Sequence, residues 1–353
     1  MVSASRYLGV LVSALATAVA VSVFAVQPAA AEAARAHVVG QVPLGGSVSQ
    51  IDVYSPSMDR VVTNRVIRAA GGGPAPTLYL LTGIGGGVDG ISWWDDTDVR
   101  EFFADKRVNV VMPVGGAFSM YTDWRADDPA VGRNRWQTYL TRELPPTLDA
   151  ELGTTGRNAI AGVSMSAGSA IDLAIQAPEV YDAVAAYSGC PWAADAAGAA
   201  MVTAQVIRGG GNPGNMWGSP GDALWRAHDA FANASALAGK TIFLSAASGT
   251  PGAIDRGLPF PPIEAIASSC TAAFAERLEE LGLPAIHVNR SEGSHTWGQF
   301  ETDLHDSWPH LAPALAHRGS FKPSARLRAF RRPRADADES RASVPPEPSP
   351  DRR

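Results

Sequence analysis

Six short apolar runs lie in the central part of the chain, and each is bounded by glycine, proline or polar residues. A continuous apolar run of this length is typical of a strand that is buried on both faces of a sheet. Helical patterns separate several of the runs, for example over 262–282. This alternation predicts an α/β fold with a mostly parallel central sheet and helices on both faces. The predicted strands are 77–83, 108–114, 158–163, 183–189, 241–247 and 285–289.

The two ends of the chain differ from this central part. Arg6 precedes a long apolar run and small residues follow at 29–31, which together predict a secretory signal peptide over residues 1–31. The run is nearly long enough to span a bilayer, so a membrane anchor is the alternative. Residues 318–353 are rich in Arg, Pro and Ser, a composition that buries too little apolar surface to fold. We therefore expect one domain over 38–317, a disordered tail, and a secreted protein that contacts the cell envelope peripherally.

Charge and cysteine content narrow the class of protein. The formal net charge is −6, which argues against a nucleic-acid partner because phosphate binding requires a basic face. Hydrophobic residues make up 46% of the chain, which is enough for a sizeable core. The two cysteines, Cys190 and Cys270, are compatible with one disulfide in an oxidising compartment, and their spacing excludes a zinc knuckle.

The strand predicted at 158–163 leads directly into Ser164 and then into an alanine-rich helical pattern. In α/β-hydrolases a nucleophilic serine occupies a sharp turn between a strand and a helix, and small residues are needed two positions before and after it. Gly162 fits this pattern, whereas Ser166 stands where glycine is usual and Gly168 comes two residues later. The motif alone leaves two interpretations open: a nucleophile, or a serine in a seam of small residues.

The order of residues along the chain favours the nucleophile. α/β-hydrolases place the serine first, then the acid, and then a histidine after the last strand, where this chain has His295. Asp255 and Glu264 both lie between the last two predicted strands, and chain order does not choose between them. An oxyanion hole needs two backbone N–H groups, for which the candidates are Met165, directly after the serine, and Ile84, in a glycine-rich loop after the first predicted strand.

Longer motifs in the chain resemble those of the mycolyltransferase family. These are secreted acyltransferases of mycolate-making actinobacteria, and they include the antigen 85 complex. The motifs occur in the family's order over about residues 42–311, and MPVGGAFSMYTDW and SHTW are the most specific of them. The others include YLLTGIGGG, YLTRELPPTL, IAGVSMSAGSA and NMWGSPGDALWRAHD. The resemblance implies an α/β-hydrolase fold and a Ser-Glu-His triad.

The resemblance assigns roles to individual residues of this chain. The family's serine and histidine match Ser164 and His295. Its glutamate lies early in the helix before the last strand, which selects Glu264 over Asp255 as the acid. Its oxyanion donors match the two candidates named above, the residue after the serine and the residue in the glycine-rich loop.

A sugar site is also implied. The family's tryptophan after the catalytic histidine matches Trp297, and we expect aromatic residues such as Trp124 to line the same site. Thr82 stands where antigen 85 proteins have an aspartate that contacts trehalose, and Gly85 stands where they have an arginine. This edge of the site therefore lacks two charged groups that hold trehalose in the antigen 85 proteins.

The implied reaction is acyl transfer. A mycolyl group would pass from trehalose monomycolate to the serine and then to a second trehalose monomycolate or to cell-wall arabinogalactan, without a metal ion or an organic cofactor. We expect a monomer whose partners are trehalose mycolates and arabinogalactan. A secreted carboxylesterase of the same fold is the alternative, because both enzymes use one triad and differ in whether water or a sugar attacks the acyl-enzyme.

Overall fold

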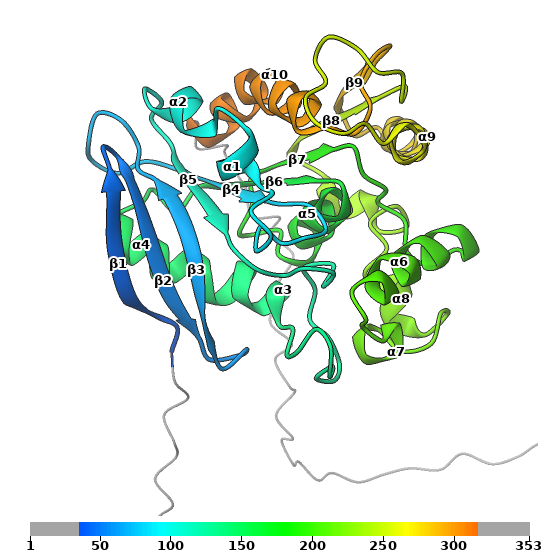
Figure 1. Ribbon diagram of the computed structural model, residues 1–353, viewed down its shortest axis with the longest axis horizontal. Helices are drawn as coiled ribbons and strands as arrows, with labels where there is room; N and C mark the ends of the chain where they lie inside the picture. Colours follow the sequence, from blue (N-terminus) through cyan, green and yellow to red (C-terminus); the bar gives the residue numbers. More distant parts are fainter. Residues whose placement is uncertain (1–34, 317–353) are drawn as a thin grey trace, which may run out of the picture.

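A nine-stranded sheet forms the centre of the molecule, and helices cover both of its faces (Figure 1). The computed structural model describes residues 35–316, so the predicted signal peptide over 1–31 and the predicted tail over 318–353 lie outside the described residues. The strands follow one another across the sheet in the order β1-β2-β3-β5-β4-β6-β7-β8-β9. Their bounds are β1 His37–Gly45, β2 Val48–Ser55, β3 Arg60–Ile67, β4 Thr77–Leu81, β5 Asn109–Pro113, β6 Asn158–Val163, β7 Ala183–Tyr187, β8 Thr241–Ala247 and β9 Ile286–Arg290.

The six strands from β4 to β9 are the six apolar runs of the sequence, and they pair in parallel. Every residue of β4, β5, β6 and β7 is buried, because helices cover both sides of the sheet at these strands. The prediction of an α/β fold with a mostly parallel central sheet is therefore confirmed.

The first three strands are absent from the sequence prediction. They pair antiparallel with one another, and β3 pairs antiparallel with β5. β2 alternates strictly between buried and half-buried positions, with Ile51 and Val53 pointing into the core. β1 is mostly exposed and its pairing with β2 shifts register between Val38 and Gly40 and again between Pro43 and Gly45. β2 and β3 are fully buried mainly on one face and β1 has no buried residue, so none of the three has the continuous apolar run of a strand that is buried on both faces.

Two sets of helices sandwich the sheet, each with its own hydrophobic core. One face is covered by α1 Trp93–Asp96, α2 Val99–Phe103 and α10 Trp297–Ala316. The other is covered by α3 Trp136–Thr138, the π-helical turn η1 Tyr139–Glu143, α4 Leu144–Leu152, α5 Met165–Gln176 and α9 Pro261–Glu280. Within residues 35–316, none of the helices combines the length and the hydropathy that crossing a membrane requires.

The connection from β7 to β8 is a helical insertion that stands beside the end of the sheet (Figure 1). It contains α6 Ala196–Arg208, α7 Pro213–Met216, α8 Ala223–Ala227 and the short 3₁₀ helix η2 Ala234–Leu237. Buried residues of α6, α7 and α8 form a small separate core with Trp124 and Trp217. This insertion builds the surface next to the loops at the carboxyl ends of the parallel strands.

The loops that follow the parallel strands lie together at the carboxyl-terminal end of the sheet, because β4, β6, β7, β8 and β9 all run in the same direction. In open α/β sheets, ligands bind outside the carboxyl-terminal ends of the strands. Each of the predicted catalytic residues lies in or just after such a loop.

Candidate active site

Ser164 occupies the turn between β6 and α5 in a strained backbone conformation. Its φ is 56° and its ψ is −118°, a combination that residues other than glycine rarely adopt. The turn is tight because a Cβ atom on Gly162 would lie only 2.1 Å from the carbonyl oxygen of Ser166. The turn thus has the geometry of a nucleophile elbow, which lifts the serine hydroxyl out of the sheet edge.

The departure from the usual elbow motif at Ser166 is accommodated inside the turn. The Ser166 side chain is fully buried, and its hydroxyl accepts a hydrogen bond from the N–H of Val163 at 2.8 Å. Besides Gly162, a second position near the turn requires glycine: at Gly189, after β7, a Cβ would lie 2.3 Å from the Cβ of Ala167 and 2.7 Å from the Ser164 carbonyl oxygen. A small polar residue at 166 is therefore compatible with the sharp turn.

His295 bridges the serine and a buried carboxylate. Its Nε2 lies 2.9 Å from Ser164 Oγ, and its Nδ1 lies 2.7 Å from Glu264 Oε2. The histidine follows β9 in a left-handed conformation with φ 64°. Its backbone N–H donates to Gln299 Oε1 at 3.0 Å, which fixes the turn against the start of α10.

Glu264 lies in the first turn of α9 and is completely buried. Its Oε1 accepts three hydrogen bonds, from the N–H of Ala247 at 2.6 Å, the Gln299 amide at 2.8 Å and the Ser188 hydroxyl at 2.9 Å. The other oxygen is left to face His295. A carboxylate with this set of donors is well suited to stabilise a positive charge on the histidine ring.

Asp255, the other candidate acid, does not contact the histidine ring. Its carboxylate accepts hydrogen bonds from the N–H of Ser294 and the hydroxyl of Thr296, the residues on either side of His295. The structure therefore brings together the Ser164, His295 and Glu264 side chains that the resemblance selects.

Gln299 and Ser188 are part of this polar cluster and are not predicted from the sequence. Gln299 is fully buried and holds both the backbone of His295 and the side chain of Glu264. It also donates to the Ser188 hydroxyl at 2.8 Å. The one available signal was the spacing of Gln299, four residues after the histidine at the beginning of a helix.

Asp303, one helical turn after Gln299 in α10, is a second buried carboxyl group near Glu264. Asp303 is fully buried and pairs with Arg290 on β9 at 2.9 Å. Burial raises the pKa of Asp303 to about 7, although the attraction of Arg290 acts in the opposite direction. The charge of Glu264 nearby also raises this pKa, so the two carboxylates lie within electrostatic reach of each other.

The two candidate oxyanion donors flank the serine. Met165 is the first residue of α5, a position whose N–H group has no partner within its own helix. Ile84 belongs to the loop after β4, and its carbonyl accepts from the N–H of Phe118 at 2.9 Å. The preceding residue, Gly83, passes so close that a Cβ there would lie 3.8 Å from the Cβ of Ser164. The loop therefore lies beside Ser164, the position that an oxyanion donor requires if this serine is the nucleophile.

The three residues expected to bind substrate have different environments. Trp297 is half-buried at the start of α10, and its ring packs edge-to-face on Trp93 at a centroid distance of 5.3 Å. Thr82 is 4% exposed, and its hydroxyl has no hydrogen-bond partner within residues 35–316. Trp124 is 1% exposed, and its indole N–H donates to the carbonyl of Ser119. Trp124 is thus a core residue, which argues against the sugar contact expected from the sequence.

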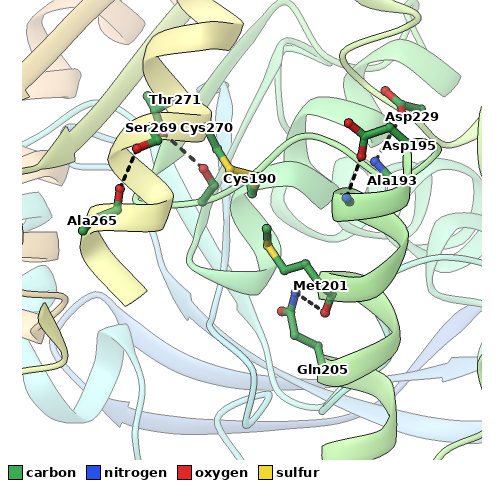
Figure 2. Close-up of a disulfide and its surroundings, with 12 residues drawn as sticks. Cys190, Ala193, Asp195, Met201, Gln205, Asp229, Ala265, Ser269, Cys270 and Thr271 are labelled. Atoms are coloured by element: carbon green, nitrogen blue, oxygen red, sulfur yellow. Dashed lines mark hydrogen bonds between the residues drawn. A yellow bond between two sulfur atoms is a disulfide. The ribbon is translucent and has the colours of Figure 1, made fainter. Parts of the chain in front are cut away.

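A disulfide joins Cys190, just after β7, to Cys270 in α9 (Figure 2). The Cα atoms are 5.0 Å apart, and the two residues are separated by 80 positions in the sequence. The neighbouring Thr271 hydroxyl donates to the carbonyl of Gly189 at 3.2 Å. The bridge therefore ties the helix that carries Glu264 to the strand end beside Ser164.

Removing this disulfide should lower thermal stability without changing the fold. A cross-link over 80 residues is expected to contribute about 4 kcal/mol by restricting the unfolded chain. The double substitution Cys190→Ser and Cys270→Ser should then lower the Tm by about 10 °C in calorimetry. Reductant should lower the Tm of the natural protein and leave that of the double variant unchanged; equal Tm values for the two oxidised proteins would contradict this account.

The site combines a serine, a histidine in contact with it and a buried glutamate on the other side of the histidine ring, on a parallel sheet covered by helices. This combination defines an enzyme of the α/β-hydrolase class with a serine nucleophile. Within residues 35–316, no group of three or more His, Cys, Asp or Glu side chains is arranged to hold a metal ion.

Comparison with known proteins agrees with this class and narrows it. Residues 55–311 match the Esterase family. The chain is 31% identical to the diacylglycerol acyltransferase/mycolyltransferase Ag85A of Mycobacterium leprae over 296 residues, which cover 79% of this chain and 88% of the relative. It is also 31% identical to Ag85A of Mycobacterium tuberculosis over 283 residues, 77% of this chain and 82% of the relative. The chain therefore belongs to the Esterase family and, within it, to the mycolyltransferases, and it is an acyltransferase.

Solved structures show the same relationship. The crystal structure of Mycobacterium tuberculosis MPT51 (FbpC1) is similar with a TM-score of 0.64 and 27% identity, covering 74% of this chain and 96% of that one. An S-formylglutathione hydrolase from Agrobacterium tumefaciens is similar with a TM-score of 0.55 and 19% identity, covering 79% of this chain and 99% of that one. At that level of identity the second similarity concerns the fold alone.

Proposed function

We propose that this acyltransferase moves a mycolyl group from trehalose monomycolate, through an ester on Ser164, to a second trehalose monomycolate or to cell-wall arabinogalactan. The observation that carries the catalytic part is the continuous hydrogen-bonded chain from Glu264 through His295 to Ser164. The substrate part draws on the relatives, whose names describe mycolyltransferases.

In the first half of the reaction, His295 Nε2 accepts the proton of the Ser164 hydroxyl as Oγ attacks the carbonyl carbon of the mycolyl ester. The negative charge that develops on the carbonyl oxygen is held by the N–H groups of Met165 and Ile84. The bond from that carbon to the trehalose oxygen then breaks. The protonated His295 gives its proton to this oxygen, so trehalose leaves as a neutral sugar and the mycolyl group stays on Ser164.

The second half reverses these steps with a new acceptor. A sugar hydroxyl gives its proton to His295 Nε2 as its oxygen attacks the mycolyl-serine carbonyl. The bond to Ser164 Oγ breaks, and the serine recovers its proton from the histidine. Glu264 stays ionised throughout and stabilises the positive ring at each stage.

Two observations support a sugar and an exported enzyme. Trp297 follows the histidine turn directly and presents a half-buried ring beside the site, and aromatic faces of this kind pack well against sugars. The Cys190–Cys270 disulfide supports export, because such bonds persist in oxidising compartments.

The product formed from trehalose monomycolate alone separates transfer from hydrolysis. Water is present at roughly 55 M, so a sugar wins only if the site holds it at a high effective concentration. We expect trehalose dimycolate to dominate the extracted lipids, and mass spectrometry to detect a mycolyl adduct on the protein. Free mycolic acid as the main product, even at high donor concentration, would instead identify a carboxylesterase. A Ser164→Ala sample provides the background.

A further inference from the structure

The loop between β8 and α9 is hydrogen-bonded to the turn that carries His295. Asp255 Oδ1 accepts from the N–H of Ser294 at 3.0 Å and from the hydroxyl of Thr296 at 2.7 Å. Its other oxygen accepts from the N–H of Gly252 at 2.8 Å, within its own loop. One carboxylate therefore holds the residue before the histidine, the residue after it, and the loop that leads to α9.

Backbone hydrogen bonds strengthen the same connection. The N–H of Phe260, at the start of α9, donates to the carbonyl of Ser294 at 2.7 Å. The N–H of Gly249 donates to the carbonyl of Gly293 at 3.0 Å, and the N–H of Gly293 donates to the carbonyl of Thr250 at 2.7 Å. The loop thus fixes the spacing between the helix that bears the acid and the turn that bears the base.

The histidine turn needs such support because its backbone is strained. His295 has φ 64°, a conformation that costs free energy in a residue other than glycine and persists only when surrounding contacts enforce it. Both ring nitrogens are also engaged at once, at 2.9 Å and 2.7 Å. A displacement of about 1 Å would break one of these contacts, and a misplacement of that size can cost about 100-fold in rate.

Asp255 is suited to this task because it is ionised. Burial acts to raise the pKa of Asp255, but the hydrogen bonds from Thr296, Gly252 and Ser294 outweigh burial and lower the pKa below its ordinary value. Hydrogen bonds to an ionised acceptor are about twice as strong as those between neutral groups.

We infer that Asp255 and Thr296 are positioning residues, which hold the His295 turn so that the ring meets both Ser164 and Glu264. This inference rests on the proposed triad and does not depend on the identity of the acyl group or of its acceptor. Neither residue touches the reacting atoms, and both act through the histidine.

The test compares kcat and KM on a short-chain p-nitrophenyl ester. Thr296→Val keeps the shape of the side chain but removes its hydroxyl, and we expect kcat to fall about tenfold with KM within about twofold. Thr296→Ser restores the hydroxyl and should keep kcat within about twofold. Asp255→Ala removes all three contacts and should lower kcat by about 10- to 100-fold, again with little change in KM.

Asp128 provides the matched control for Asp255. It is another loop carboxylate that accepts several hydrogen bonds, more deeply buried than the half-buried Asp255. Its donors are Ala130, Val131, Asn212 and Asn215, which lie far along the chain from the histidine turn. Asp128→Ala should lower the Tm and leave kcat unchanged for the folded protein at temperatures below its Tm.

Three results would overturn the inference. These are an unchanged kcat in both Asp255→Ala and Thr296→Val, an equal loss in Thr296→Ser and Thr296→Val, or an equal loss of kcat in Asp128→Ala. If Asp255→Ala does not fold, the pair of Thr296 variants decides alone. A failure of the proposed triad gives a different pattern, because Ser164→Ala would then retain activity.

Discussion

Replacing Ser164 with alanine is expected to lower acyl transfer by about a thousandfold or more. The hydroxyl at this position is the group that would form the acyl-enzyme. Within the described residues it is the hydroxyl that contacts His295 Nε2, at 2.9 Å. Loss of the nucleophile from a triad of this kind typically removes nearly all of its contribution to the rate. The measurement is the initial rate of p-nitrophenyl ester turnover, followed by the rate with trehalose monomycolate.

The same variant should remain folded. Alanine at 164 retains the strained backbone, removes only one hydrogen bond and leaves the Gly162 contact unchanged. We therefore expect a Tm within a few degrees of that of the natural protein. A folded Ser164→Ala protein that keeps more than a tenth of its activity would refute the assignment of the nucleophile.

Replacing Glu264 with glutamine should be nearly as damaging, on the order of a thousandfold in kcat. Three donors point at Oε1, from Ala247, Ser188 and Gln299, so this position must remain a carbonyl oxygen. The new NH₂ group would then face His295 Nδ1, which would have to give up its proton to accept the hydrogen bond. The remaining proton would lie on Nε2 and face the serine hydroxyl, and a ring in this tautomer cannot act as its base.

Asp255→Asn is the matched variant for this experiment. Its amide oxygen can still accept from Ser294 and Thr296, and only the contact with Gly252 is lost. We expect kcat to fall by no more than about tenfold. If Asp255→Asn proves more damaging than Glu264→Gln, the roles of the two carboxylates are reversed.

The strands that could be predicted from the sequence are those buried on both faces. β6 and β8 coincide with the predicted runs, and the neighbouring parallel strands differ only at their ends. β1, β2 and β3 escaped prediction because β1 has no buried residue and β2 and β3 are fully buried mainly on one face, so none of them has a continuous apolar run. Alternation of apolar and polar residues is a weaker sequence signal for a strand than a continuous apolar run.

The proposed catalytic residues could be predicted from the sequence for a different reason. Ser164 and His295 are tied to strand ends, and their order along the chain is informative. Glu264 and Asp255 lie nine residues apart in the same connection, and the path of the loop before α9 together with the rotation of α9 decides which carboxylate faces the ring. That rotation depends on contacts with distant segments, which no local pattern records.

The supporting residues show the same limit. Ser188 directly follows β7 and Gln299 lies in α10, and they meet at Glu264 only because the parallel strands align their ends. Trp124 shows the opposite error, since an aromatic residue can line a site or fill a core with the same sequence signature. Its burial against Trp217 and Trp225 decides the matter.

The irregular first strand has a consequence for how copies of the protein meet. β1 is the outer strand of the sheet, and it exposes Val39, Val42 and Leu44 at half or nearly half of their surface (Figure 1). If such an apolar outer strand were straight, it would be a template for strand pairing between molecules, and so for aggregation. The two register shifts and Pro43, which lacks an N–H group, interrupt the ladder of donors and acceptors along this edge. The regular stretch between the two shifts is only Gly40–Pro43, which leaves a neighbouring chain little to extend.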